Sequence, residues 1–538
     1  MAIKKLNNKL KLQSMKKIVL SAVAALSIGY AAQAQDRYVD EVFTTVDYTF
    51  GTVYGQNYHF LPFHDSPITP GAPGPIPPLG YTPTIGNMTM DVYQPGGDTE
   101  TDRPLVLVIH SGNFLPRYIN RSATGDKGDS SVVELANRFA KRGYVTATPR
   151  YRLGWNPNGA TLVDRTRSLL TAVYRSIHDI QTCVRFFKAN AATYKIDPTK
   201  IILVGVGAGG YVTNAYATLD KQEETALDKF QDDMGNSVID TAVWGGVNGM
   251  GGSLNVYNHA GFSNDVSTVV NLGGALGDIS WLEAGDVPMI GFHCWKDVFA
   301  PYDSGTVIVP TTGEPVVDVH GTRQAIKKAV ALGNNADLVA ANFTDPISLR
   351  AYSLNVKAQY EGLYEFRTPT TPAGLEEGSP WDWWDSTTVV ATGTLLGIPS
   401  SGVGSNGSPN NLHLSGLLTN PNMSATKGRL YIDTIMKFAA PRIAIVNGLF
   451  DGSISDIQKE SSQLSVYPNP ISANFSVTVL NQNIQSVKVI DLNGRTVQFY
   501  NNLNSGNVTL ERGDIAAGTY ILDVNTTNGR FTRKVIFK

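Results

Sequence analysis

The chain has 538 residues, of which 42% are hydrophobic and 17% are charged, and its formal net charge is −2. A chain of this length and composition can bury a large core, which excludes a protein that is disordered overall. Because the charge is almost balanced, there is no basic excess of the kind that nucleic acids or anionic membranes attract, and neither partner is predicted.

Residues 1–34 predict a signal peptide for export. Met15 is followed by two lysines, an apolar run over residues 18–30 and an Ala-x-Ala cleavage site at residues 32–34. The apolar run is too short to cross a bilayer and no later segment is apolar enough, so no membrane span is predicted. We expect translation to start at Met15 and the mature chain to begin near Gln35.

Residues 35–85 follow as a segment rich in proline and glycine. Seven prolines lie between Pro62 and Pro78, and proline removes a backbone donor that regular structure needs. We therefore expect an irregular arm that wraps over the surface of the next domain.

Residues 86–455 contain strands that alternate with helices, which predicts an α/β fold with a doubly wound, mostly parallel sheet. The predicted strands are residues 88–95, 105–109, 144–149, 201–204, 267–273 and 288–292. The predicted helices are residues 131–142, with a capping box at Ser131 and Glu134, and residues 162–192, 211–216, 321–331 and 424–439. The polar, glycine-rich residues 217–266 predict a lid or loop excursion, and the pattern weakens again over residues 340–420.

The metal-binding residue types follow no ligand spacing. The histidines are scattered and neither H-x-x-x-H nor C-x-x-C occurs, so no metal site and no cofactor is predicted. Cys183 and Cys294 are expected to be two buried thiols, with a single disulfide as the alternative.

A strand, a glycine cluster and the start of a helix follow one another over residues 200–211, which read Lys-Ile-Ile-Leu-Val-Gly-Val-Gly-Ala-Gly-Gly-Tyr. In all but one position this stretch resembles the G-x-S-A-G-G elbow of carboxylesterases and hormone-sensitive-lipase-like esterases, which are α/β-hydrolases. The loop His110-Ser111-Gly112-Asn113-Phe114 falls where HGGG-type esterases place their oxyanion loop. The resemblance implies an α/β-hydrolase-like fold, with Gly207 standing where the nucleophilic serine is expected.

The resemblance also implies roles for other residues. The backbone N–H groups of Gly112, Asn113 and Ala208 would form the oxyanion hole. Residues 292–302 resemble the segment H-G-x-x-D-x-x-V-P-Y of the family, which points to Asp297 as the acid.

For the base, the family places a histidine after the acid and before the last helix. His320 comes too early, which leaves His413 as the predicted base.

Each of these roles has an ordinary structural alternative. The loop over residues 110–114 can be a plain strand-to-loop turn, Asp297 a surface carboxylate paired with Lys296, and His413 a solvated loop residue. The glycine run over residues 205–210 also satisfies G-x-G-x-G-G of a dinucleotide loop, but it lies after several β/α units, which disfavours that interpretation.

A glycine at the nucleophile position keeps the shape of the elbow, because glycine adopts positive φ at little cost. It carries no attacking atom, and loss of the nucleophile costs on the order of 10⁶ in kcat. The first hypothesis is therefore a secreted, catalytically disabled pseudo-hydrolase that binds a small-molecule ester, acyl or glycan ligand. The second is an active ester hydrolase with a displaced nucleophile such as Ser111, acting with Asp297 and His413. The third is a structural surface protein whose pocket is filled.

The composition becomes polar over residues 456–463, which predicts a linker, and residues 464–538 then show short alternating strands. The clearest strands are residues 475–479, 487–490, 508–510, 520–524 and 533–537, which predict a small all-β sandwich. The Tyr467-Pro468-Asn469-Pro470 entry, the Gly518-Thr519-Tyr520 motif and the basic last strand resemble the type IX (Por) secretion C-terminal sorting domain of Bacteroidetes. That resemblance implies that residues 464–538 engage the type IX secretion machinery. It also implies passage through the periplasm and outer membrane to the cell surface or the medium.

Overall fold

The computed structural model describes residues 37–60, 83–120, 122–309, 313–370, 374, 376–395, 397–403, 407, 409–449, 464–479, 482–491, 495–527 and 530–538. These residues divide into two compact units, one formed by residues up to 340 with residues 350–449, the other by residues 341–349 and 464–538. The predicted signal peptide over residues 1–34, the predicted start at Met15 and the predicted linker over residues 456–463 lie outside the described residues.

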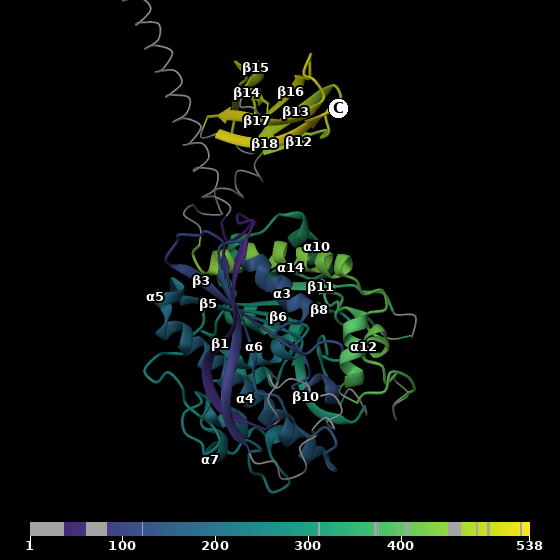
Figure 1. Ribbon diagram of the computed structural model, residues 1–538. Coiled ribbons are helices and arrows are strands. Elements are labelled where there is room, and N and C mark those ends of the chain that lie inside the picture. Colours follow the sequence, from purple (N-terminus) through teal and green to yellow (C-terminus); the bar gives the residue numbers. More distant parts are fainter. Residues whose placement is uncertain are drawn as a thin grey trace, which may run out of the picture. The chain divides into compact units, whose positions relative to one another are not determined.

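In the described part of the chain, the first unit is built on an eight-stranded sheet with the order β1-β2-β4-β3-β5-β6-β8-β11 (Figure 1). From β4 to β11 every neighbouring pair is parallel, whereas β1 and β2 join antiparallel at one edge. The strands are β1 Val46–His59, β2 Thr84–Pro95, β3 Arg103–Ile109, β4 Val145–Pro149, β5 Ile196–Val206, β6 Thr268–Leu272, β8 Met289–Cys294 and β11 Leu363–Phe366. A smaller sheet pairs β7 Ala275–Leu276, β9 Ser304–Ile308 and β10 Pro315–Gly321 in the order β7-β10-β9. The predicted α/β class with a mostly parallel sheet is therefore confirmed.

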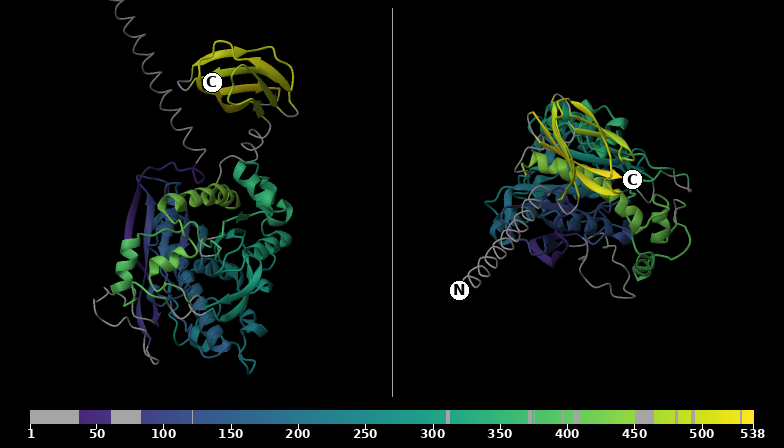
Figure 2. Two further views of the ribbon diagram at one scale, coloured as in Figure 1. Left: turned by 90° about the vertical axis from the view of Figure 1, so that its right-hand side faces the viewer. Right: turned by 90° about the horizontal axis from the view of Figure 1, so that it is seen from above.

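Helices cover both faces of the large sheet (Figures 1 and 2). Helix α14 packs with α3 on one face, where Phe438 of α14 meets Phe292 of β8, and α4, α6 and α8 cover the other face. The α-helices are α2 Arg117–Asn120, α3 Ser130–Ala140, α4 Leu162–Ala189, α5 Ala191–Tyr194, α6 Ala208–Thr218, α7 Thr241–Trp244, α8 Thr322–Leu332, α9 Ala336–Ala341, α10 Pro346–Leu354, α11 Lys357–Tyr360, α12 Ser386–Leu395, α13 Leu412–Leu417 and α14 Ala425–Val446. The 3₁₀ helices are η1 Gln222–Ala226, η2 Asp228–Phe230 and η3 Ile279–Trp281.

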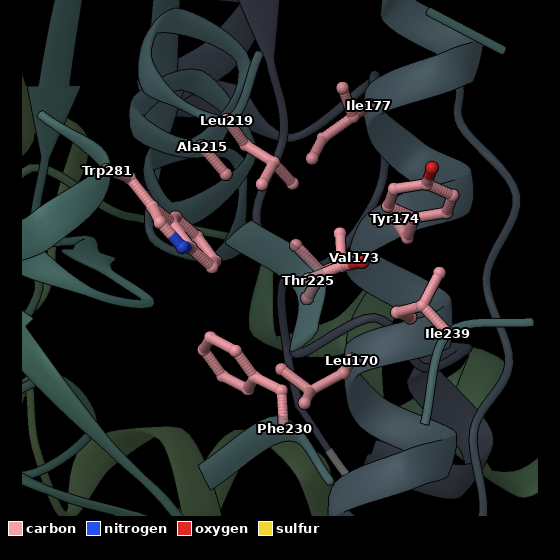
Figure 3. Close-up of a pocket in the computed structure, with 10 residues that line it drawn as sticks. All are labelled: Leu170, Val173, Tyr174, Ile177, Ala215, Leu219, Thr225, Phe230, Ile239 and Trp281. Atoms are coloured by element: carbon pink, nitrogen blue, oxygen red, sulfur yellow. The ribbon is translucent and has the colours of Figure 1, made fainter. Parts of the chain in front are cut away.

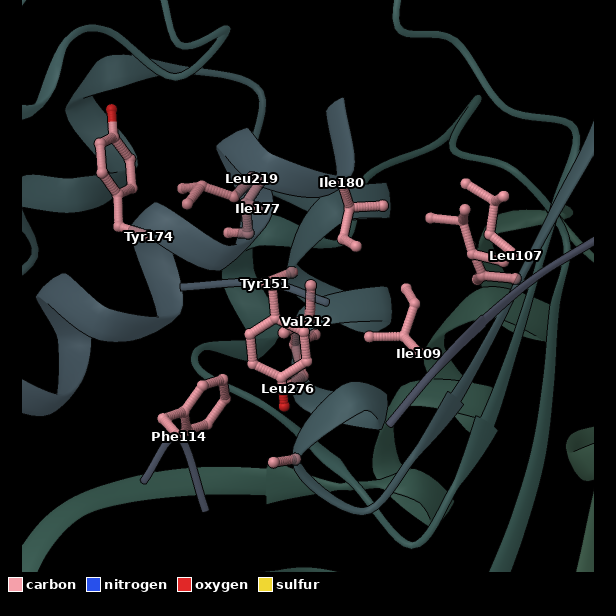
Figure 4. Close-up of a cluster of buried hydrophobic side chains, with 14 of the residues drawn as sticks. Leu107, Ile109, Phe114, Tyr151, Tyr174, Ile177, Ile180, Val212, Leu219 and Leu276 are labelled. Atoms are coloured by element: carbon pink, nitrogen blue, oxygen red, sulfur yellow. The ribbon is translucent and has the colours of Figure 1, made fainter. Parts of the chain in front are cut away.

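The main core lies between the sheet and α4. Alternate residues of β3, among them Leu107 and Ile109, point into it and meet Ile177 and Ile180 of α4 (Figure 4). Every residue of β3 is buried, because helices cover both faces of the strand. This explains why a central strand of a parallel sheet reads as an unbroken apolar run rather than as an alternation.

The prediction of an irregular arm over residues 35–85 is wrong for residues 46–59. These form β1, a long edge strand that pairs with β2 with register shifts near Thr49 and Val53. The prolines that suggested irregular structure begin only at Pro62, whereas Val46, Tyr48 and Phe50 alternate as a strand does. Residues 61–82 lie outside the described residues.

The excursion over residues 217–266 contains η1, η2 and α7 and is held against α4 by polar side chains. The Tyr174 hydroxyl donates to the Gly245 carbonyl at 3.0 Å, Gln181 Nε2 to the Val247 carbonyl at 2.9 Å and Arg185 Nε to the Asn258 carbonyl at 2.9 Å. All three side chains come from the buried face of α4, which favours a fixed loop over an opening lid.

Two local predictions are corrected by the structure. The capping box at Ser131 and Glu134 is wrong, because α3 begins after Asp129 with no side-chain cap bond and the Ser131 hydroxyl donates to Asp382 instead. The weakly patterned residues 340–420 contain β11, the edge strand of the large sheet, which the sequence did not predict.

The C-terminal unit consists of two antiparallel sheets, β12-β13-β16 and β15-β14-β17-β18, around one hydrophobic core. Its strands are β12 Leu464–Tyr467, β13 Asn474–Val479, β14 Ile484–Ile490, β15 Thr496–Tyr500, β16 Asn507–Glu511, β17 Gly518–Thr526 and β18 Arg530–Phe537. Residues of both sheets, such as Val477 and Val487, are fully buried in that core. The predicted small all-β sandwich is confirmed, with β12 and β15 added to the predicted strands.

Cys183 and Cys294 are separate buried thiols, as predicted, and burial raises the pKa of both. Of the described helices, none combines the length and the hydropathy that a bilayer-spanning segment requires.

Candidate functional site at the carboxyl edge of the large sheet

The predicted elbow is a sharp turn between β5 and α6. Gly207 has φ +53° and ψ −113°, and its N–H donates to the Leu272 carbonyl at the end of β6 at 2.8 Å. A Cβ atom on Gly209 would overlap the Ile109 carbonyl group of β3, and one on Gly210 would lie 3.0 Å from Gly274. The glycines after Gly207 are therefore required because α6 begins in close contact with the ends of β3 and β6.

The hydroxyl of Ser111 lies directly over Gly207. A Cβ atom built on Gly207 would overlap Ser111 Oγ and would lie 3.0 Å from Ser111 Cβ. The first N–H of α6, on Ala208, points to Ser111 Oγ at 3.4 Å. The Ser111 side chain thus occupies the space into which a side chain at position 207 would extend.

The loop after β3 has the unusual backbone that the sequence suggested. Gly112 has φ +121° and Asn113 has φ +51°, and the Asn113 side chain donates to Asn120 at 2.9 Å. A Cβ atom on Gly112 would lie 2.8 Å from the Cα of Gly125, so only glycine fits at position 112. The loop is a fixed part of the fold, but its geometry does not by itself identify an oxyanion hole.

The Asp297 carboxylate is buried just after β8, with a side chain only 4% exposed. Its Oδ1 accepts the backbone N–H groups of Phe299 at 2.7 Å and Ala300 at 3.2 Å. Burial raises the pKa of Asp297 to about 7, because these two hydrogen bonds compensate only part of the lost hydration. Lys296 instead pairs with Glu376 at 3.0 Å, so the alternative of a surface Asp297–Lys296 pair is wrong.

The His293 imidazole lies close to Asp297, with 3.8 Å between His293 Nε2 and Asp297 Oδ2. Its Nε2 faces the Ala300 carbonyl at 3.0 Å, and because a carbonyl only accepts, Nε2 carries the proton. Its Nδ1 then accepts from the Thr322 hydroxyl at 2.7 Å. Burial lowers the pKa of His293 to about 4. Both ring nitrogens are used inside the fold, which makes His293 a structural residue.

The loop after β11 presents a glycine and a tryptophan to Asp297. A Cβ atom on Gly378 would lie 3.2 Å from Asp297 Oδ1. The fully buried Trp381 ring packs on Gly273, where an added Cβ would lie 3.3 Å from the ring and 3.6 Å from Asp297 Oδ2. The space beside the acid is therefore lined by Gly378 and an indole ring.

His413 lies on α13, and the contacts recorded for it are with a neighbouring loop. Its Nδ1 accepts from Trp384 Nε1 at 3.1 Å, and its backbone N–H is capped by Asn411. In a Ser-His-Asp triad the corresponding Nδ1 donates to the acid. Among the described residues, no recorded contact brings His413 to Asp297, Gly207 or Ser111.

An apolar pocket lies beside α6, away from the elbow (Figure 3). It lies between α4, α6 and the excursion, is open to solvent, and offers about 30 Å³ of space to the centre of a water molecule. It is lined by Leu170, Val173, Tyr174, Ile177, Ala215, Leu219, Thr225, Phe230, Ile239 and Trp281. Ala215 and Leu219 are about 10 and 16 Å along the helix axis from Ala208 at ~1.5 Å per residue, so the pocket is separate from the elbow.

The described residues contain no group of three or more His, Cys, Asp and Glu side chains arranged to hold a metal ion.

Comparison with known families agrees with this architecture. Residues 90–307 match the family described as BD-FAE, and residues 465–538 match the family described as secretion system C-terminal sorting domain. No curated protein matches the chain. Among solved structures, the chain is similar to Thermogutta terrifontis esterase 2 in its form phosphorylated by paraoxon, with 17% identity over 40% of this chain and 69% of that chain and a TM-score of 0.27. The apo form and the butyrate-bound form of the same enzyme each share 16% identity over 40% of this chain and 70% of theirs, also with a TM-score of 0.27.

The sheet order and the family match define the first unit as an α/β-hydrolase-like domain. More narrowly, residues 90–307 resemble the BD-FAE family, and residues 465–538 resemble a secretion system C-terminal sorting domain. The sorting domain indicates export through the type IX system to the cell surface or the medium.

Sequence reasoning singled out Gly207 and Asp297 but could not find what faces them. The sequence offers Ser111 only as a candidate displaced nucleophile, and Gly378 and Trp381 carry no motif. Their positions depend on how the loops after β3 and β11 fold back over the sheet, which no local pattern encodes.

Proposed function

We propose that this exported hydrolase domain has lost ester hydrolysis and acts by binding a ligand rather than by chemistry. The observation that carries the proposal is the pairing of Gly207 with Ser111: the turn has no side chain of its own, and Ser111 fills the space above it. The proposal takes Gly207 as the nucleophile position of the family elbow and Asp297 as the remnant acid.

Acyl transfer needs a nucleophile, a base that activates it and an acid that orients the base. The geometry of the site supports neither a nucleophile nor a base. The Ala208 N–H, which would stabilise an oxyanion, points instead to Ser111 Oγ. Gly378 and Trp381 stand beside Asp297 where an imidazole would be needed. Without a nucleophile and a base, only substrate binding and the backbone donors can accelerate hydrolysis, by roughly 10³–10⁴-fold over the reaction in water.

The position of Ser111 also favours a second candidate, an active hydrolase in which its hydroxyl replaces the missing nucleophile. Ser111 Oγ lies 3.4 Å from the backbone nitrogen of Ala208. Among the described residues, however, the structure shows no imidazole in contact with this hydroxyl. The nearest histidine in sequence, His110, is buried and directs its Nδ1 to the Ser111 carbonyl at 2.6 Å, not to the hydroxyl.

Hydrolysis of p-nitrophenyl butyrate separates the two candidates. The disabled domain gives no turnover above buffer, and Ser111→Ala and Asp297→Ala change nothing. Turnover by the wild-type chain that falls by more than about 10³-fold in Ser111→Ala would establish Ser111 as the nucleophile and overturn the proposal.

For binding, the apolar pocket beside α6 is the place we propose, because its lining is almost entirely apolar and it is open to solvent. Its chemistry fits a short acyl chain or a small aromatic group. Trp281 lines the pocket, so its fluorescence should report toluene binding, whereas anionic butyrate should bind more weakly. Ala215→Phe fills the pocket and should abolish the toluene response. A response that survives Ala215→Phe would place the ligand elsewhere, and no response to any apolar probe would favour the structural hypothesis.

A further inference from the structure

In each sheet of the C-terminal sandwich one face is buried and the other faces solvent. In the four-stranded sheet the buried face carries Val487, Val489, Leu522, Val524 and Val535. Because side chains alternate along a strand, the neighbouring residues point to solvent. The register pairs Lys488 with Phe499, Ile490 with Ile521, and Thr519 with Ile536, so these residues share the outer face of the sheet, on which Asp523, opposite Lys488, is itself buried.

That solvent face carries an apolar stripe, which we define as Ile490, Phe499, Ile521 and Ile536. Phe499 is 47% exposed, Ile521 39% and Ile536 41%, while Ile490 is half-buried. One residue comes from each of β15, β14, β17 and β18, which are neighbours in that order, so the stripe crosses the whole sheet. Large apolar side chains clustered on a solvent face in this way mark an interaction site more often than chance exposure does.

The opposite solvent face of the same sandwich has a different composition. On the three-stranded sheet, the register pairs Ser465 with Thr478, Ser476 with Thr509 and Thr478 with Asn507. These side chains are small and polar, and Tyr467 stands alone at the end of β12. The apolar stripe is therefore a property of one face and not of the domain as a whole.

Charge adds a second property to the surface. Residues 464–538 contain seven Lys and Arg against four Asp and Glu, whereas the whole chain has a formal charge of −2. On the stripe itself, Lys488 Nζ lies 5.7 Å from the centre of the Phe499 ring. A partner that fits presents an apolar patch with acidic residues around it, since protein interfaces place apolar residues centrally and charges at the rim.

We propose that the apolar stripe is the surface by which the sorting domain docks on the outer-membrane export machinery. We choose this occupant because the segment matches a secretion sorting domain, whose task is to be recognised by that machinery. The other solvent face is also less suited to docking, because apart from Tyr467 it carries small polar side chains. The inference concerns the sorting domain alone and is independent of the function proposed for the hydrolase domain.

Export of the full chain in a bacterium that possesses the type IX system tests the proposal. Ile521→Lys puts a charge at the centre of the stripe, and its matched control, Thr509→Lys, puts the same charge on the opposite solvent face. We expect the exported fraction to fall by about tenfold or more for Ile521→Lys, as when a central interface residue is lost, and to stay unchanged for Thr509→Lys. Equal export of both variants at equal expression would overturn the proposal.

Folding and self-association are checked on the purified chains. If Ile521→Lys loses the calorimetric transition of the sandwich, the milder variant Ile521→Thr, which keeps a β-branched residue, is used in its place. Reduced export of Ile521→Thr supports the docking surface, and normal export overturns it. If the wild-type chain is a dimer that Ile521→Lys converts to a monomer without loss of export, the stripe joins two copies of this chain and the proposal is wrong.

Discussion

The contact between Ser111 and Gly207 can be measured as a coupling free energy between the two positions. Gly207→Ser places a side chain at φ +53° and ψ −113°, a conformation that costs a non-glycine residue about 1–3 kcal/mol. With Ser111 present, the new Cβ also overlaps Ser111 Oγ, and such overpacking adds about 1–3 kcal/mol. With Ser111→Gly, only the backbone strain remains. We therefore expect Gly207→Ser to cost about 1–3 kcal/mol less in the Ser111→Gly background than in the wild type.

Urea unfolding of the four chains followed by tryptophan fluorescence supplies these numbers. All seven tryptophans lie between Trp155 and Trp384, so the signal reports the hydrolase domain and is blind to the C-terminal sandwich. Contacting residues show coupling of about 0.5–3 kcal/mol, whereas independent sites add within about 0.5 kcal/mol. Additive costs would mean that Ser111 does not stand over Gly207, and the reasoning from the filled elbow would fail.

Three further predictions concern Asp297, a histidine introduced at position 378 and the last helix. Asp297 has a pKa of about 7 in the fold against an ordinary value of 3.8, so the protonated carboxyl group stabilises the folded state. This contribution to the free energy of unfolding is fully present below about pH 4 and is lost as the pH rises through 7. Asp297→Asn removes the titration, and between pH 5 and pH 8 it should gain stability relative to wild type on the order of 2 kcal/mol, whereas parallel stability curves would contradict the buried carboxylate. Replacement of Gly378 by histidine together with Gly207→Ser and Ser111→Gly should introduce measurable p-nitrophenyl butyrate hydrolysis that Asp297→Ala removes, and the same triple variant with His413→Ala should remain active. If activity instead requires His413, the base position is not Gly378. The Arg442–Glu361 pair joins α14 to the residues just before β11 at 2.8 Å, with both side chains fully buried. Glu361→Leu removes the carboxylate partner of a buried guanidinium and should cost about 3–5 kcal/mol in the same fluorescence assay, whereas a cost below about 1 kcal/mol would show that the pair does not hold the helix.

The sequence predicted the parts of the fold that are encoded locally. Unbroken apolar runs such as Leu105–Ile109 predicted buried strands, and the glycines after Val204 predicted the turn, because both patterns follow from backbone geometry and burial. β1 was missed because the prolines from Pro62 onward predicted irregular structure for the whole segment, although its first part alternates as a strand does. β11 was missed because its four residues, Leu363–Phe366, are too short to show a period.

The candidate site was predicted only in outline. The sequence pointed to Asp297 because it follows a strand with a family-like ending, and its role as the acid stays a prediction. The base could not be found, because the choice of His413 rested on chain order alone, while Trp384 occupies its Nδ1 in the fold. Nothing in the sequence around Gly378 indicates that it lies beside Asp297, and nothing around Ser111 indicates that it lies over Gly207. Both contacts depend on how the loops after β3 and β11 fold over the edge of the sheet.

Steady-state hydrolysis of p-nitrophenyl butyrate by the purified full chain is the most direct test of the central claim. If the elbow lacks an attacking group, the rate equals that of buffer, and Ser111→Ala and Asp297→Ala leave it there. Turnover that saturates with substrate and disappears in either variant would show that the domain is a working esterase.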